Sequence, residues 1–114
     1  MIPRVFAMAM FLLISRHKSE HCPVFNEKAC KVYLDYFKNV DRLMEKHKIK
    51  SLGGCAVHAE HLTVGLFEAS SLKAWEEFSM EPEVHALSAY ETMEVKLAMS
   101  MEEAMGLIKK AKKT

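Results

Sequence analysis

The sequence is short of the features that mark several classes of protein. Its three cysteines form no C-x-x-C pair, which argues against a disulfide framework and against a cysteine-only zinc knuckle. The longest apolar run, residues 5–14, is far shorter than the ~20 residues of a membrane-spanning helix. Lysine and arginine number 16 against 15 aspartates and glutamates, so the net charge creates no general attraction for nucleic acid or anionic membranes. We therefore expect a cytoplasmic protein with reduced thiols and with neither nucleic acid nor membrane as a partner.

The composition predicts one globular domain. Half of the 114 residues are hydrophobic, which is enough for a single core but not for two. No internal repeat, low-complexity segment or linker divides the chain. We therefore expect residues 1–114 to form a single domain.

Hydrophobic periodicity predicts alternating strands and helices. Short apolar runs and a period of two indicate strands, whereas apolar residues that recur every three or four positions indicate helices. Asn26 and Ser70 or Ser71 are expected helix caps, and Ser100 with Glu103 forms a capping box. The expected elements are a strand over 8–14, a helix over 26–47, strands over 49–59 and 62–69, a helix over 70–81 with another turn over 83–89, a strand over 90–99 and a closing helix.

Two further details concern packing. Gly53-Gly54 suggests a bulge or a close backbone approach within a strand. Cys30 and Cys55 are expected to be small buried hydrophobes. The closing helix is expected to bury its apolar residues, which are Met101, Ala104, Met105, Ile108 and Ala111.

This order predicts an α+β fold, the ferredoxin-like βαββαβ arrangement with an antiparallel sheet ordered 4-1-3-2 and a C-terminal helix. The expected strands over 8–14, 62–69 and 90–99 carry apolar residues on both faces. Two helices cover only one face of such a sheet, so a second copy of the chain is the simplest cover for the other. We therefore expect a homodimer.

In this arrangement the chain resembles the dimeric α/β-barrel superfamily, in which two ferredoxin-like subunits pack sheet to sheet. Within that superfamily it is similar to small bacterial and archaeal domains with a histidine and a Cys-Pro pair after the first strand, here His17 and Cys22-Pro23. The resemblance implies a cleft between sheet and helices that takes a small-molecule ligand. The superfamily includes monooxygenases, haem enzymes, isomerases, dehalogenases and ligand-sensing domains, so the fold alone selects no reaction.

Chain direction places five of the six histidines at or near one rim of the sheet. His17 and His21 follow the first strand, His58 and His61 lie at the second hairpin, and His85 precedes the last strand. Because the first and third strands are neighbours, His61 should approach His17 more closely than His58 does. Cys22 lies where the N-terminus of a helix favours its thiolate.

These residues support three interpretations. The first is a transition-metal site, with zinc or iron bound by His17, His21, His61 and Cys22; in an enzyme, His17 and Cys22 are the expected catalytic residues. The second is metal-free acid–base chemistry by a histidine paired with a glutamate of the rim, Glu20, Glu60 or Glu91. The third is a polar rim without a site, in which case the protein is a ligand-sensing or interaction module. Whether the protein is an enzyme stays open.

Overall fold

The structure is a computed structural model that describes residues 8–112. The order of elements is the predicted one, with three short 3-10 turns in the connections. The strands are β1 (Ala9–Arg16), β2 (Lys50–Val57), β3 (Leu62–Ala69) and β4 (Thr92–Ala98); the helices are α1 (Glu27–Lys46), α2 (Leu72–Ser79), α3 (Pro82–His85) and α4 (Met101–Lys112); the turns are η2 (Ser19–His21), η3 (His58–Glu60) and η4 (Ala86–Ala89).

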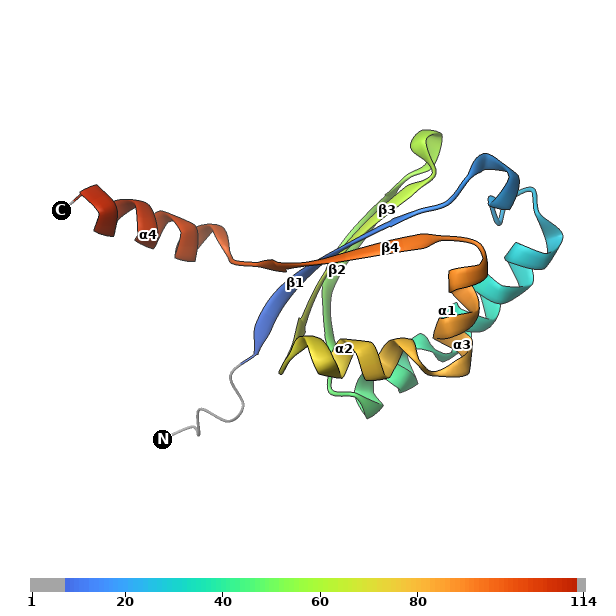
Figure 1. The fold of residues 1–114 in the computed structure, drawn as a ribbon, viewed down its shortest axis with the longest axis horizontal. Coiled ribbons are helices and arrows are strands. Elements are labelled where there is room, and N and C mark those ends of the chain that lie inside the picture. Colours follow the sequence, from blue (N-terminus) through green and yellow to red (C-terminus); the bar gives the residue numbers. More distant parts are fainter. Residues whose placement is uncertain (1–7, 113–114) are drawn as a thin grey trace.

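All four strands form one antiparallel sheet. The order across it is β2-β3-β1-β4, which is the predicted 4-1-3-2 counted from the other edge. The central strand β1 pairs with β3 and with β4, with Arg16 opposite both Leu62 and Thr92. Helices α1, α2 and α3 lie on one side of this sheet (Figure 1). The α+β, ferredoxin-like fold class is therefore confirmed.

An aromatic core joins the sheet to these helices. The rings of Phe11 and Phe67 stack with centroids 5.4 Å apart, and Trp75 of α2 stacks on Phe67 at 4.4 Å. Phe78, one helical turn later, is completely buried. Period-two alternation in β1 and β3 and a spacing of three in α2 bring these side chains to the same layer.

Local sequence signals begin the helices and bend one strand. The side chain of Asn26 accepts a hydrogen bond from Ala29 N at the start of α1, and Ser71 does the same at α2. The register of β2 against β3 shifts between Ser51 and Gly53, and Gly53 has a φ of +121°. A Cβ atom at Gly54 would lie 2.6 Å from the carbonyl oxygen of Val64. The predicted bulge and close approach are therefore both present.

The sheet face away from the helices is apolar in its centre but not at β4. Alternation directs Leu12 and Ile14 of β1 and Leu66 of β3 to this face. On β4 the same face carries Glu94 and Lys96, whose charged groups lie 3.5 Å apart. The expectation of two apolar faces is therefore wrong for β4, where clean alternation produces one polar face.

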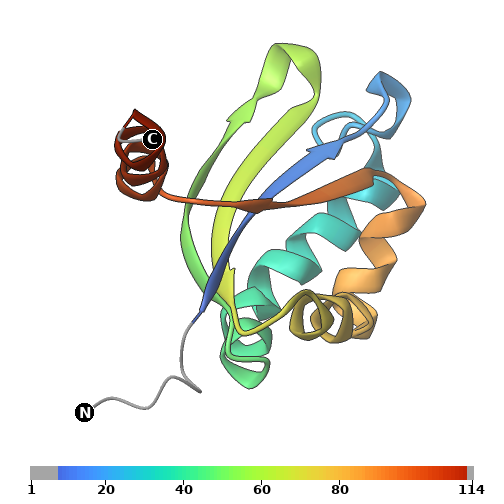
Figure 2. The same ribbon diagram turned by 60° about the vertical axis from the view of Figure 1, so that its left-hand side comes forward.

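Two predictions of burial are also wrong. Helix α4 stands away from the sheet (Figures 1 and 2), and none of its residues is buried. Within residues 8–112 the helix does not pack on the sheet, because β4 leads the chain away from the core (Figure 1). Cys55 is exposed and Cys30 is only partly buried, whereas Cys22 is buried. No described helix is long and apolar enough to cross a bilayer.

Candidate functional site

The first two residues of the site come together because β1 and β3 are antiparallel neighbours. The backbone N–H of His17 donates to the carbonyl oxygen of His61 at 3.1 Å, which extends the β1–β3 pairing by one step. His61 leaves η3 in the left-handed conformation, with φ 52°. The two rings lie edge to face, and Nε2 of His17 is 3.1 Å from Nδ1 of His61. The topology therefore pairs two residues that are 44 positions apart.

Cys22 joins this pair from the loop between β1 and α1. Its N–H donates to the carbonyl oxygen of Ser19, and its own carbonyl oxygen accepts from the N–H groups of Phe25 and Asn26. These bonds fold the loop into a tight turn at the entrance to α1, and Cys22 is only 1% exposed. One ligand atom from each of His17, Cys22 and His61 lies within 4.8 Å of the other two. We call these three residues the His-Cys group.

The donor types of the His-Cys group suit a transition metal ion. Two imidazole nitrogens and a sulfur are ligands of zinc and iron, and bond lengths of about 2.0–2.3 Å in a tetrahedron put neighbouring ligand atoms about 3.5 Å apart. Nε2 of His17 and Nδ1 of His61 are 3.1 Å apart, and all three donor atoms lie within 4.8 Å of one another, which is compatible with that value. Three protein ligands would leave the fourth position of a tetrahedral ion open, as in catalytic zinc sites.

The surroundings keep the His17 ring in its neutral form. Burial lowers the pKa of His17 below its usual 6.5, and the nearby histidines His61, His21 and His58 lower it further. The ring of Tyr33 from α1 also meets the His17 ring edge-on, with centroids 6.4 Å apart. A neutral imidazole keeps the lone pair that a metal ligand needs.

The other predicted site residues are not members of the His-Cys group. His21 is outside the His-Cys group, because its ring packs edge-on against Tyr90 at 5.7 Å. The His58 ring is 6.2 Å from that of His61. His85 lines a separate hollow beside Trp75. Glu20 and Glu60 are exposed.

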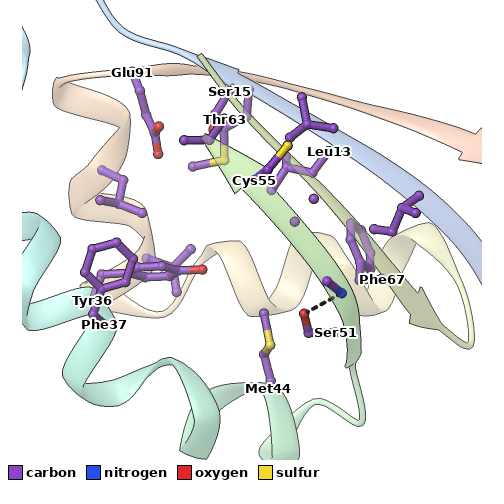
Figure 3. Close-up of a pocket in the computed structure, with 18 of the residues that line it drawn as sticks. Leu13, Ser15, Tyr36, Phe37, Met44, Ser51, Cys55, Thr63, Phe67 and Glu91 are labelled. Carbon is purple, nitrogen blue, oxygen red and sulfur yellow. Dashed lines mark hydrogen bonds between the residues drawn. The ribbon is translucent and has the colours of Figure 1, made fainter. Parts of the chain in front are cut away.

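A cavity of about 370 Å³ lies between the sheet and α1, α3 and η4, within the range of about 300–1,000 Å³ for small-molecule sites. Polar groups gather at one end, where Glu91 faces Ser15 and Thr63 (Figure 3). The hydroxyl groups of Ser15 and Thr63 are hydrogen-bonded to each other. Most of the wall is apolar, formed by Leu13, Phe37, Met44, Phe67, Trp75, Val84, Leu87 and Met93.

Glu91 is the one carboxyl group among the described residues that line this cavity. The Tyr33 hydroxyl donates to its Oε2 at 3.1 Å. Burial raises the pKa of Glu91 above its ordinary value, although hydrogen bonds from Tyr33 and Ser15 oppose the shift. Burial and the nearby Glu91 carboxylate also raise the pKa of Tyr33 and bring that of Tyr36 to about 12. A perturbed carboxyl group in an apolar cleft is a common feature of functional sites.

Tyr33 connects the two parts of the site. Its ring contacts His17 and its hydroxyl bonds Glu91, so the His-Cys group and the cavity share one side chain. The sequence identified Glu91 as a carboxylate of the rim, but not Tyr33 as its partner. Ser15 and Thr63 were not identified either. The signal for Ser15 was a hydroxyl on a strand that is otherwise apolar from Met10 to Ile14.

Comparison with known proteins supports the fold. The chain is similar to a solved structure from Caulobacter crescentus CB15, described as a candidate antibiotic biosynthesis monooxygenase, with a TM-score of 0.50 and 15% sequence identity. The similarity covers 82% of this chain and 92% of that one. No protein-family model and no curated protein matches the chain. At this identity the likeness supports the ferredoxin-like fold alone, and the function has to be argued from the site.

Proposed function

We propose that the protein binds a transition metal ion, zinc or iron, through His17, Cys22 and His61, beside a cleft that takes a small molecule. The observation that carries this proposal is the convergence of three donor atoms within 4.8 Å from three separate segments of the chain. His21 is not included in this ligand set, because its ring packs against Tyr90. A thiolate ligand also needs a reducing compartment, and the cytoplasm provides one.

The open coordination position of such an ion would be available for catalysis. An ion held by three protein ligands can polarise a bound water or ligand, and in that case His17 and Cys22 contribute to catalysis as ligands. Tyr33 contacts the His17 ring and bonds Glu91, so a hydrogen-bonded acid would be available near the ligand set. This arrangement favours a metal-dependent enzyme over a polar rim without a site.

The cavity supports a second candidate function. Its wall is predominantly apolar and its 370 Å³ are formed without any member of the His-Cys group. A ligand-sensing module would need only this cavity. Such a protein would bind its ligand equally well with and without a metal ion.

We also propose that two copies associate through the sheet face opposite the helices. Leu12, Ile14 and Leu66 lie on that face, and Leu66 is 38% exposed. A contiguous apolar patch of this kind usually marks an interface. Light scattering during size exclusion should give about twice the chain mass of 13.0 kDa, and a monomer at micromolar concentration would contradict the dimer.

The metal proposal is tested with protein purified without a histidine tag and titrated with Zn²⁺ and with Co²⁺. Cobalt bound by a thiolate gives a charge-transfer absorption in the near ultraviolet, so the spectrum reports the sulfur ligand directly. We expect one ion per chain, with the absorption lost in Cys22→Ser and retained in Cys55→Ser, the exposed cysteine that serves as the control. Absence of saturable binding, or an unchanged absorption in Cys22→Ser, would contradict the proposed site.

A further inference from the structure

We propose that the cleft selects a neutral molecule, with an apolar body that fills the cavity and one polar oxygen group that hydrogen-bonds to the Glu91 carboxyl group. This inference rests on the proposed binding of a small molecule in the cleft. It adds the chemical class of that molecule and the residue that recognises it.

The lining offers a ligand one main polar partner, the carboxyl group of Glu91. Glu91, Ser15 and Thr63 lie at one end of the cavity (Figure 3). The other polar side chains of the lining are Tyr33, whose hydroxyl donates to Glu91, Ser51, whose Oγ accepts from Gly53 N, Tyr36 and Cys55. Ser15 and Thr63 bond each other. Glu91 accepts from Tyr33 and Ser15, but a carboxyl group has about four lone-pair positions and therefore keeps capacity for a further hydrogen bond. A ligand with several polar groups would have to bury the others against apolar side chains, at a cost of about 1–3 kcal/mol each.

The charge of the lining excludes anions. The described residues that line the cavity include no lysine, arginine or histidine, and Glu91 is their single acid. A carboxylate or phosphate in this cavity would lose its hydration without gaining a cation, and it would face Glu91. The cavity therefore discriminates against anionic ligands.

Cations are also disfavoured. Among the described residues no ion pair involves Glu91, whose side chain is partly buried beside Tyr33 and Tyr36. An ammonium group would have to lose its hydration in a mostly apolar cleft and to hold Glu91 fully ionised there, and burial of both charges is costly. A neutral hydroxyl group donates a hydrogen bond to the same carboxyl group without that cost.

Four naphthalenes of one shape test this selectivity. They are 2-naphthalenemethanol, 2-ethylnaphthalene, 2-naphthoate and 2-naphthylmethylammonium, which differ only in the group that would meet Glu91. Binding is measured by calorimetry and by the emission of Trp75, the chain's single tryptophan, which lines the cavity. We expect the alcohol to bind roughly 5- to 10-fold more tightly than the hydrocarbon, as one net hydrogen bond implies, and both ions to bind more weakly than the alcohol.

Variants of Glu91 assign the preference to its carboxyl group. Glu91→Gln keeps hydrogen-bonding capacity and should keep the preference for the alcohol, whereas Glu91→Leu should bind the alcohol and the hydrocarbon equally. Glu76→Leu, an exposed position on α2, is the matched control and should behave as the unaltered protein does. Should Glu91→Leu fail to fold, Glu91→Gln and the ranking of the four probes still decide the question.

Each contrary outcome has a separate meaning. Tightest binding of the naphthoate or the ammonium would overturn the ligand class while leaving cleft binding intact. An equal preference in Glu91→Leu and the unaltered protein would remove Glu91 from recognition. Failure of all four probes to bind would overturn the cleft itself, whereas the titrations with Zn²⁺ and Co²⁺ would still test the metal site.

Discussion

The two ends of α1 carry similar residue types in opposite arrangements. At the C-terminal end, Nε2 of His47 and Nζ of Lys46 each lie 2.7 Å from Oε2 of Glu81, and the His47 ring packs edge-on against Phe78. We call this the paired end. At the N-terminal end are the His-Cys group and Glu91, and among the described residues no ion pair joins them. Lys46, His47 and Glu81 at the paired end are therefore bonded to one another.

Glu81 at the paired end and Glu91 at the N-terminal end have opposite pKa shifts. Hydrogen bonds from Lys46 and His47 lower the pKa of Glu81, whereas burial raises the pKa of Glu91. A carboxylate that is bonded to Lys46 and His47 holds the structure together, and one without an ion-pair partner retains the capacity to bind something else. Ionisable groups in a cleft that have no ion-pair partner therefore indicate a functional site better than ion-paired groups do.

The largest expected difference is in stability. Phe78→Ala at the paired end removes a completely buried ring and should cost about 3–5 kcal/mol of unfolding free energy. Cys22→Ala, which removes one buried sulfur at the other end, should cost about 1 kcal/mol in the metal-free protein. Urea unfolding followed by circular dichroism measures both. A larger loss in Cys22→Ala would mean that the N-terminal end is built for stability too.

The next difference is in metal affinity. His61→Ala should weaken Zn²⁺ binding by at least about 100-fold, since even changes outside the ligand set cost about 10- to 100-fold. His47→Ala is the matched control, and its affinity should be unchanged because the His47 ring bonds Glu81 instead. Competition with a chromophoric chelator measures both values. Equal losses in the two variants would remove the distinction between the ends.

In thermal stability the larger effect should come from the paired end, where His47 lies, and not from the His-Cys group. His47→Ala removes both the bond to Glu81 and the packing on Phe78, so its Tm should fall by about 5 °C in metal-free protein. His58→Ala removes a side chain from an exposed residue near His61 and should leave Tm within about 1 °C. Scanning calorimetry at pH 7 makes the comparison, and a Tm of His47→Ala equal to that of the unaltered protein would show that the paired end adds nothing.

The smallest effect is on the pH dependence of stability. The pKa of Glu91 is raised in the folded state, so its contribution is present below its ordinary 4.5 and is lost as pH rises through the raised value. The pKa of Glu81 is lowered, so its contribution is present above 4.5 and is lost as pH falls through the lowered value. At pH 7, Glu91→Gln should therefore raise Tm relative to the unaltered protein and Glu81→Gln should lower it.

Unfolding curves measured from pH 3 to pH 8 separate these two slopes. The difference in Tm between Glu91→Gln and the unaltered protein should grow with pH, and that for Glu81→Gln should shrink as pH falls. Parallel curves for the two variants would mean that both carboxyl groups have the same environment.

The sequence by itself determined the order of the elements and the neighbours within the sheet. Period-two runs, three- to four-residue spacing and the caps at Asn26 and Ser71 are local signals, and each is present in the structure. Strand direction then followed from the order of elements, which is why His61 could be expected beside His17. The pairing of Glu91 with a residue outside the rim, Tyr33, had no such signal, because α1 and the segment before β4 are far apart in the chain.

Only the tertiary structure decided where the loop residues and the last helix lie. The bond from His21 N to Lys18 O closes η2 and turns the loop, and in the resulting arrangement His21 lies against Tyr90 while Cys22 joins His17 and His61. A loop has no repeating period from which a side chain's direction can be predicted. For α4 the period was right but no surface lies beneath it in the described chain. An amphipathic pattern shows which face of a helix is apolar, and packing alone decides whether that face meets anything.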